Sequence, residues 1–288
     1  MKRQNFKADD GVWIAADIAG PSNAPTVVLA HGGGQTRHSW ARAAQQLTLA
    51  GYRVINYDAR GHGDSDWSPD NQYPLPRRWA DMEMIVTAIS EPVAVVGASM
   101  GGITAMYGVS QGFRPDALVL VDIVPNAERA GMQRVRDFMA SGLSGFASIE
   151  EAADAVAAYN PARPRPESLE GLKKNLRHRE DGRWYWHWDP GMVHIDIDEE
   201  RANMEETMQS LGAAKDLSIM LVRGLGSDVV TEESVRLFRA KLPSLEVADI
   251  GGAGHMVAGD KNDAFNETII NFLEWKFRPA NCDSSSID

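Results

Sequence analysis

The stretch "VVGASMGGITA", residues Val95 to Ala105, decides the fold of this chain. A run of apolar, β-branched residues ends in small residues around Ser99, and residues typical of a helix follow. A strand that leads into Gly-x-Ser-x-Gly and then a helix is the pattern of a nucleophile elbow, a sharp turn that raises a serine hydroxyl above the strand ends. Gly97 and Gly101 lack the side chain that would clash in such a turn. The stretch therefore predicts Ser99 as a nucleophile.

Short apolar runs alternate with helix-like segments on both sides of this elbow. This order predicts an α/β fold, with a parallel sheet, right-handed crossovers and helices on both faces. Turn residues near the start predict an antiparallel hairpin at one edge. The expected strands are Phe6–Ala8, Val12–Ala19, Thr26–His31, Tyr52–Asp58, Pro92–Ala98, Ala117–Asp122, Ser218–Gly224 and Leu245–Ile250, and the expected helices are Ser39–Ala50, Leu75–Ile89, Met100–Ser110, Thr231–Leu242 and Asp260–Arg278.

The middle of the chain departs from this rhythm. From Pro125 to about Gly212 no strong strand pattern appears, and the segment holds helix-like stretches, a proline-rich link at Asn160–Glu167 and the aromatic run "RWYWHWDP" at Arg183–Pro190. This pattern predicts a helical cap at 125–212 inserted into a core formed by 1–124 and 213–280. The final residues, 281–288, are expected to be a frayed tail.

Composition narrows the function classes. The chain has 288 residues, 43% of them hydrophobic, and a formal net charge of −11, which disfavours binding to nucleic acid or to anionic membranes. Cys282 is the only cysteine, so the sequence predicts no disulfide framework, no cysteine-based metal site and a cytoplasmic location. No stretch approaches the roughly 20 apolar residues of a membrane span, and the start resembles no leader. The sequence leaves a homodimer open.

A serine hydroxyl needs a base, and the base needs an acid that orients it. His255 in the glycine-rich loop "GGAGHMVAG" is the expected base, because it follows the last predicted strand. In enzymes with a nucleophile elbow, the catalytic residues come in the order Ser, then Asp or Glu, then His along the chain. Asp228, after the strand Ser218–Gly224, is the expected acid, and Asp122 at the end of an earlier strand is the alternative.

Two backbone donors should stabilise the oxyanion that forms when Ser99 attacks a carbonyl. One is the N–H of Met100, directly after the nucleophile. The other should come from the loop "HGGGQ" that follows an earlier strand, with Gly33 as the expected donor and Gly34 as the alternative. A phosphate-binding loop is disfavoured, because these glycines lack both the Gly-Lys-Ser/Thr ending and the Gly-x-Gly-x-x-Gly spacing.

Five stretches in register resemble the α/β-hydrolase superfamily over almost the whole chain. The resemblance implies an eight-stranded, mostly parallel sheet, a helical cap and no cofactor. It is greatest to the bacterial branch of esterases, lactonases, ring-cleavage product hydrolases, epoxide hydrolases, dehalogenases and cofactor-free haloperoxidases. The stretches are "LAHGGG" (Leu29–Gly34), "DARGHGDS" (Asp58–Ser65), "GASMGG" (Gly97–Gly102), "LVRGLGSDVV" (Leu221–Val230) and "GAGHMV" (Gly252–Val257).

The serine at the elbow discriminates within that branch. Epoxide hydrolases and haloalkane dehalogenases of this fold use aspartate there, so Ser99 favours attack on a carbonyl. We expect a serine hydrolase of a carboxylic ester or lactone with a small hydrophobic acyl group, acting through an acyl-enzyme. The alternatives are cleavage of a C–C bond in a ring-cleavage diketone and a ligand-binding receptor on the same scaffold. The expected pocket residues are Trp40, Trp184, Tyr185, Trp186 and Met256.

Overall fold

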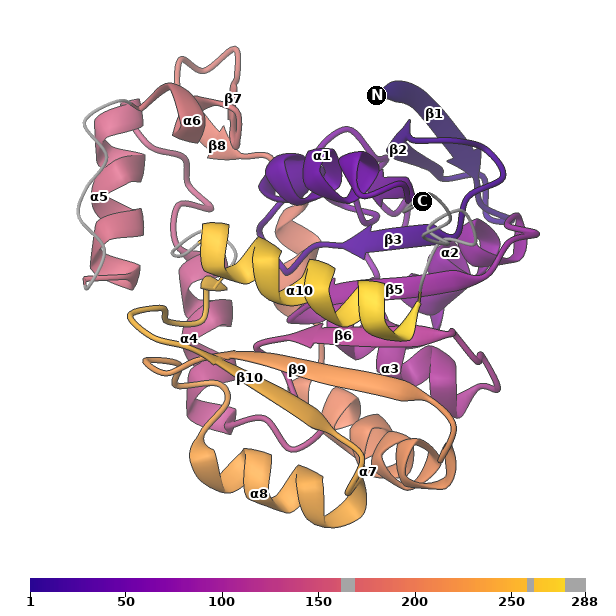
Figure 1. Ribbon diagram of the computed structural model, residues 1–288. Coiled ribbons are helices and arrows are strands. Elements are labelled where there is room, and N and C mark those ends of the chain that lie inside the picture. Colours follow the sequence, from indigo (N-terminus) through magenta and orange to yellow (C-terminus); the bar gives the residue numbers. More distant parts are fainter. Residues whose placement is uncertain (162–168, 258–261, 278–288) are drawn as a thin grey trace.

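The computed structural model describes residues 1–161, 169–257 and 262–277 (Figure 1). Its main sheet has eight strands in the order β1-β2-β4-β3-β5-β6-β9-β10. The β1–β2 and β2–β4 pairs are antiparallel and all the others are parallel, which confirms the expected fold class and the edge hairpin. The strands are β1 (Lys2–Lys7), β2 (Trp13–Ala19), β3 (Thr26–Ala30), β4 (Arg53–Tyr57), β5 (Val93–Ala98), β6 (Ala117–Val121), β9 (Ser218–Gly224) and β10 (Glu246–Ile250).

Helices cover both faces of this sheet, because the central strands carry apolar side chains on both faces. Every residue of β3 and β6 is buried. One face carries α1 (Ala41–Leu49), which follows the short helix η1 (Arg37–Trp40), and α10 (Asn262–Lys276). Figure 1 shows α1 and α10 in front of the sheet and α3 and α7 behind it. The second face carries α2 (Leu75–Thr87), α3 (Met100–Ser110), α7 (Ile197–Ala213) and α8 (Glu232–Lys241).

The segment between β6 and β9 differs in two ways from a purely helical cap. It contains a small antiparallel sheet, β7–β8, which the sequence did not predict. Its last helix, α7, packs on α3 and buries Met204 and Leu211 in the core cluster beneath the sheet. In Figure 1, α5, α6, β7 and β8 are set apart from the sheet, with α4 between. These elements are α4 (Arg129–Ala140), α5 (Ile149–Tyr159), α6 (Glu170–Lys173), β7 (Leu176–His178), β8 (Trp184–Trp186) and the short helix η2 (Pro190–His194).

Two expectations fall on residues that lie outside those described. The tail at 281–288 is one, and most of the proline-rich link at 160–167 is the other. Within the described ranges, no helix combines the length and the apolar character needed to cross a membrane.

Parallel strands bring the candidate site together at one edge of the sheet. The loop with Gly33 follows β3, Ser99 follows β5, Asp122 follows β6 and His255 follows β10. Strands β3, β5, β6 and β9 are consecutive neighbours in the sheet, so the loops at their carboxyl ends converge.

Candidate active site

Ser99 occupies a strained turn between β5 and α3. Its φ of 43° and ψ of −112° lie outside the regions that L-residues normally adopt, a feature typical of functional sites. The turn is held by hydrogen bonds from the Ser99 N–H to the Val121 oxygen at 3.1 Å and from the Ile103 N–H to the Ser99 oxygen at 2.9 Å. A β-carbon on Gly101 would lie 2.4 Å from the Ala30 oxygen, so only glycine fits there. The elbow predicted from the sequence is therefore present.

His255 lies between Ser99 and a carboxylate. Its Nε2 is 3.2 Å from Ser99 Oγ, and its Nδ1 is 2.8 Å from Asp122 Oδ2. The neutral ring with its proton on Nδ1 donates to the carboxylate and presents a lone pair to the serine hydroxyl. The imidazole is largely buried, with 8% of its side chain exposed. The structure therefore brings Ser99 and His255 together, as the sequence predicted.

Asp122 is fully buried and its carboxylate is well supplied with donors. Oδ1 accepts the Gly224 N–H at 3.0 Å, and Oδ2 accepts the Ser227 hydroxyl in addition to His255. The backbone of Asp122 is left-handed, with a φ of 49°, a conformation that aspartate tolerates better than most residues. These donors fix the carboxylate plane and so orient the imidazole.

The expected pairing of Asp228 with His255 is wrong. Asp228 lies in the turn after β9, and its carboxylate forms an ion pair with Arg134 of α4 instead. The side chains are 36% and 65% exposed, respectively. Strand β6 lies beside β5, whereas β9 is one strand further from Ser99, so the end of β6 is the nearer source of an acid. Asp122, the alternative, holds the position at His255 Nδ1.

The two expected backbone donors, Gly33 and Met100, line the same pocket as Ser99. Met100 is the first residue of α3, so its N–H has no acceptor within the helix. Gly33 lines the same pocket as Ser99, and its N–H has no acceptor among the described residues. The alternative, Gly34, is excluded as a free donor, because its N–H donates to His62 Nε2 at 3.1 Å.

Three buried histidines hold the loops around this site. His31 Nε2 accepts the Ala59 N–H at 2.9 Å, His62 accepts the Gly34 N–H, and His187 Nδ1 accepts the Gly63 N–H at 2.8 Å. Burial lowers the pKa of His31, takes that of His62 well below its usual value and lowers that of His187 to about 3. All three rings are therefore neutral acceptors of backbone N–H groups.

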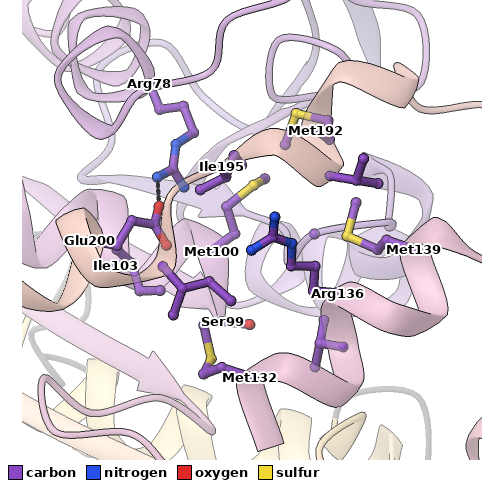
Figure 2. A pocket seen from close by; sticks show the side chains of 14 residues that line it. Arg78, Ser99, Met100, Ile103, Met132, Arg136, Met139, Met192, Ile195 and Glu200 are labelled. Atoms are coloured by element: carbon purple, nitrogen blue, oxygen red, sulfur yellow. Dashed lines mark hydrogen bonds and ion pairs between the residues drawn. The ribbon is translucent and has the colours of Figure 1, made fainter. Parts of the chain in front are cut away.

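A pocket with a cavity volume of about 70 Å³ opens beside Ser99 (Figure 2). Its polar lining consists of Arg78 from α2, Arg136 from α4 and Glu200 from α7, besides Ser99 and the backbone of Gly33. The remaining walls are apolar and come from α3, α4, η2 and the start of α7. They are Met100, Ile103, Met132, Val135, Met139, Met192, Val193, Ile195 and Ile197.

The expected pocket residues do not line this pocket. Trp40 is buried against Phe265 on the face of the sheet that α1 and α10 cover, and Met256 packs at the Gln35 side chain. Tyr185 stacks on Arg179 in the segment between β6 and β9. Trp184 and Trp186 belong to an aromatic cluster of the same segment, where Trp186 is stacked on Trp188. Neither the position of Trp40 and Met256 beside a motif nor the aromatic run at 183–190 therefore placed these side chains in the pocket.

The charged residues of the pocket were missed from the sequence. Arg78 and Glu200 form an ion pair between α2 and α7. Arg78 is only 4% exposed, and burial lowers the pKa of its guanidinium to about 10. The one available signal was an arginine on the apolar face of the helix Leu75–Thr87, next to Trp79. Within the described ranges, no group of three or more His, Cys, Asp or Glu side chains is placed to hold a metal ion.

The model of the alpha/beta hydrolase family matches residues 27–268, which include the elbow, Asp122 and His255. The chain belongs to the alpha/beta hydrolase family. This chain is similar to esterase Rv0045c of Mycobacterium tuberculosis, with 29% identity over 262 residues, 88% of this chain and 84% of the esterase. The sn-1-specific diacylglycerol lipase ABHD11 of Mus musculus is 28% identical over 277 residues, 89% of this chain and 83% of the lipase.

Solved structures agree with this assignment to the alpha/beta hydrolases. An alpha/beta hydrolase from Novosphingobium aromaticivorans has a TM-score of 0.79 at 20% identity, over 95% of this chain and 98% of that chain. A structure of the M. tuberculosis esterase Rv0045c has a TM-score of 0.74 at 25% identity, over 95% of this chain and 92% of that chain.

Proposed function

We propose that this alpha/beta hydrolase is a serine hydrolase of carboxylic esters that works through an acyl-enzyme. The observation that carries the proposal is the position of His255, which contacts Ser99 Oγ at 3.2 Å and Asp122 Oδ2 at 2.8 Å. The nucleophile Ser99, the base His255 and the orienting acid Asp122 are then connected by consecutive hydrogen bonds, as acyl transfer requires. The similarity to an esterase and to a lipase supports an enzyme that acts on esters.

The first half-reaction forms the acyl-enzyme. Ser99 Oγ attacks the ester carbonyl while His255 Nε2 accepts the hydroxyl proton. Asp122 stabilises the imidazolium and keeps its Nδ1 proton directed at the carboxylate. His255 then gives the proton to the leaving alkoxide, and the alcohol departs.

Two N–H groups would stabilise the negative oxygen of the tetrahedral intermediate. The donors are Met100 at the start of α3 and Gly33 in the loop after β3. The positive end of the α3 dipole acts in the same direction. In the second half-reaction, His255 activates a water that attacks the acyl carbon, and Ser99 is regenerated with release of the acid.

The apolar walls of the pocket support a hydrophobic acyl group. Nine methionine, isoleucine and valine side chains surround the space next to Ser99, and methionine adapts its shape to different ligands. Within a series of linear acyl esters, kcat/KM should therefore rise from acetyl to medium-length chains. Equal rates for all lengths would contradict an acyl pocket.

Labelling with a fluorophosphonate tests the nucleophile directly. Intact mass spectrometry should show a single adduct on the wild type and none on Ser99→Ala. Ser110→Ala is the matched control, because this serine ends α3 on the side away from the elbow. Ester turnover should fall to background in Ser99→Ala and stay unchanged in the control. An unlabelled wild type that unfolds cooperatively would contradict the proposal and favour a ligand-binding protein.

A further inference from the structure

The side chains that line the pocket beside Ser99 carry more positive than negative charge. Two guanidinium groups, those of Arg78 and Arg136, line it together with a single carboxylate, that of Glu200. Figure 2 shows the two arginines entering the pocket from opposite sides, Arg78 from α2 and Arg136 from α4. In a chain with a formal net charge of −11, this local excess of one positive charge among apolar walls is unusual.

Arg78 is buried without a full set of partners. Its Nη2 donates to Glu200 Oε1, but its Nε and Nη1 are buried and have no hydrogen-bond partner among the described residues. Leaving donors of a charged group unpaired in the interior is costly, so such groups normally meet an acceptor. The Arg78 guanidinium that lines the pocket therefore keeps a hydrogen-bonding capacity that no described residue meets.

Arg136 supplies the second cation. It is half-buried on α4, it lines the pocket, and no described carboxylate forms an ion pair with it. Its neighbour on the same helix, Arg134, points elsewhere and pairs with Asp228. An arginine that could reach water but lines an apolar pocket together with Met100 and Met139 gains most when an anion enters that pocket.

The pocket lies on the acyl side of the nucleophile. The leaving oxygen must sit near His255, which protonates it, and His255 is not among the described residues that line the pocket. Ser99, Met100 and Gly33 do line it, and these residues hold the attacked carbonyl in the proposed reaction. A group that fills the pocket is therefore attached to the carbonyl carbon.

We propose that the substrate is an ester whose acyl chain ends in a carboxylate, with an apolar spacer along the methionines and the terminal carboxylate bound by Arg136 and Arg78. This inference rests on the proposed function. A planar guanidinium matches a carboxylate in a bidentate arrangement, and the low dielectric of the pocket strengthens the interaction. Hydrolysis by water then releases a dicarboxylate and an alcohol.

The test compares pairs of esters that differ only in the charge of the acyl end. Monoethyl esters of linear dicarboxylic acids, from succinate to suberate, are each paired with an ethyl ester in which an isopropyl group replaces the terminal carboxylate. The wild type should prefer the charged member of at least one pair by about tenfold or more in kcat/KM. Equal rates, or faster hydrolysis of every neutral ester, would overturn the inference.

Variants assign the preference to the arginines. Arg136→Gln should lower kcat/KM for the charged ester about tenfold more than for its neutral partner, mainly through KM. Arg134→Gln on the same helix is the matched control and should change neither ester. A double variant, Arg78→Met with Glu200→Met, removes the buried pair without leaving a lone charge and should abolish the remaining preference. Equal losses for both esters in Arg136→Gln would overturn the inference.

Failure of the inference is distinguishable from failure of the proposed function. Turnover of the neutral esters that disappears in Ser99→Ala, together with the fluorophosphonate adduct, reports on the nucleophile alone. An active enzyme without preference for charge would refute the carboxylate and leave the serine hydrolase intact.

Discussion

The ends of strands β6 and β9 each place one aspartate near the candidate site, and the two have opposite surroundings. Asp122 is fully buried and accepts hydrogen bonds from Gly224, Ser227 and His255. Asp228 is partly exposed and pairs with Arg134 on the outside of α4. The order of residues along the chain allows either aspartate to be the acid. Burial together with a full set of hydrogen-bond donors identifies Asp122.

Replacing Asp122 by asparagine should have the largest effect. The asparagine side chain matches the carboxylate in size, but its amide would favour the wrong tautomer of His255, so kcat should fall about ten-thousand-fold, as in comparable triads. Steady-state hydrolysis of an activated ester measures this, with far-ultraviolet circular dichroism as the check on folding. A loss below about tenfold in a folded variant would mean that Asp122 does not orient the base.

The contrast between buried and exposed groups extends to the histidines, and pH tests it. The folded-state pKa of His187 is about 3, below the usual 6.5 of an unfolded chain. Between these two pH values the unfolded chain binds more protons than the folded chain. The free energy of unfolding is therefore highest above about pH 6.5 and falls as the pH drops from 6.5 toward 3. His187 alone should lower the free energy of unfolding by about 1.4 kcal/mol per pH unit there. His31 and His62 act in the same direction.

Urea unfolding at pH 7.5 and pH 5 measures this loss. His187→Gln keeps an acceptor for the Gly63 N–H but does not titrate, so it should lose less stability between the two pH values than the wild type. His178→Gln, at an exposed position on β7, is the control and should behave as the wild type does. An identical pH dependence in wild type and His187→Gln would contradict a neutral, buried His187.

Ser227, in the turn after β9, tests how much the donors around Asp122 contribute. Its hydroxyl donates to Asp122 and accepts the N–H groups of Val229 and Val230 at 3.1 and 3.2 Å. Ser227→Ala should reduce kcat about tenfold, because the carboxylate loses a donor and its orientation loosens, and should cost about 1–2 kcal/mol of stability. Ser227→Thr keeps the hydroxyl and should retain most of the activity. Equal activity in Ser227→Ala and wild type would show that two donors suffice.

Much of the fold could be predicted because each central strand is a short apolar run ended by a turn signal. The elbow was equally predictable, because Gly97 and Gly101 stand at the two positions where the turn has no room for a side chain. The small sheet β7–β8 escaped prediction because strands of three residues carry too little pattern. Helix α7 was assigned to the cap because sequence alone does not tell which neighbour a helix packs against.

The site was predictable where a motif fixes a backbone position and not where packing decides. Ser99, Met100, Gly33 and His255 lie in the turns and loops that follow strand ends, so their places follow from the strand order. The choice of Asp228 over Asp122 failed because chain order is shared by both. The pocket arginines lie on helices that meet only through tertiary packing, which no local spacing reveals.

The smallest expected effect is that of Asp228→Asn. Its ion pair with Arg134 joins side chains that are 36% and 65% exposed, and exposed pairs contribute about 0–1 kcal/mol. Both kcat and KM should stay within about twofold of the wild type, and the thermal midpoint should move little. Arg134→Gln should behave alike, and the double variant should add nothing further. A large loss of kcat in Asp228→Asn alone would mean that Asp228 reaches His255 during turnover, and the contrast between the two strand ends would then be one of resting positions only.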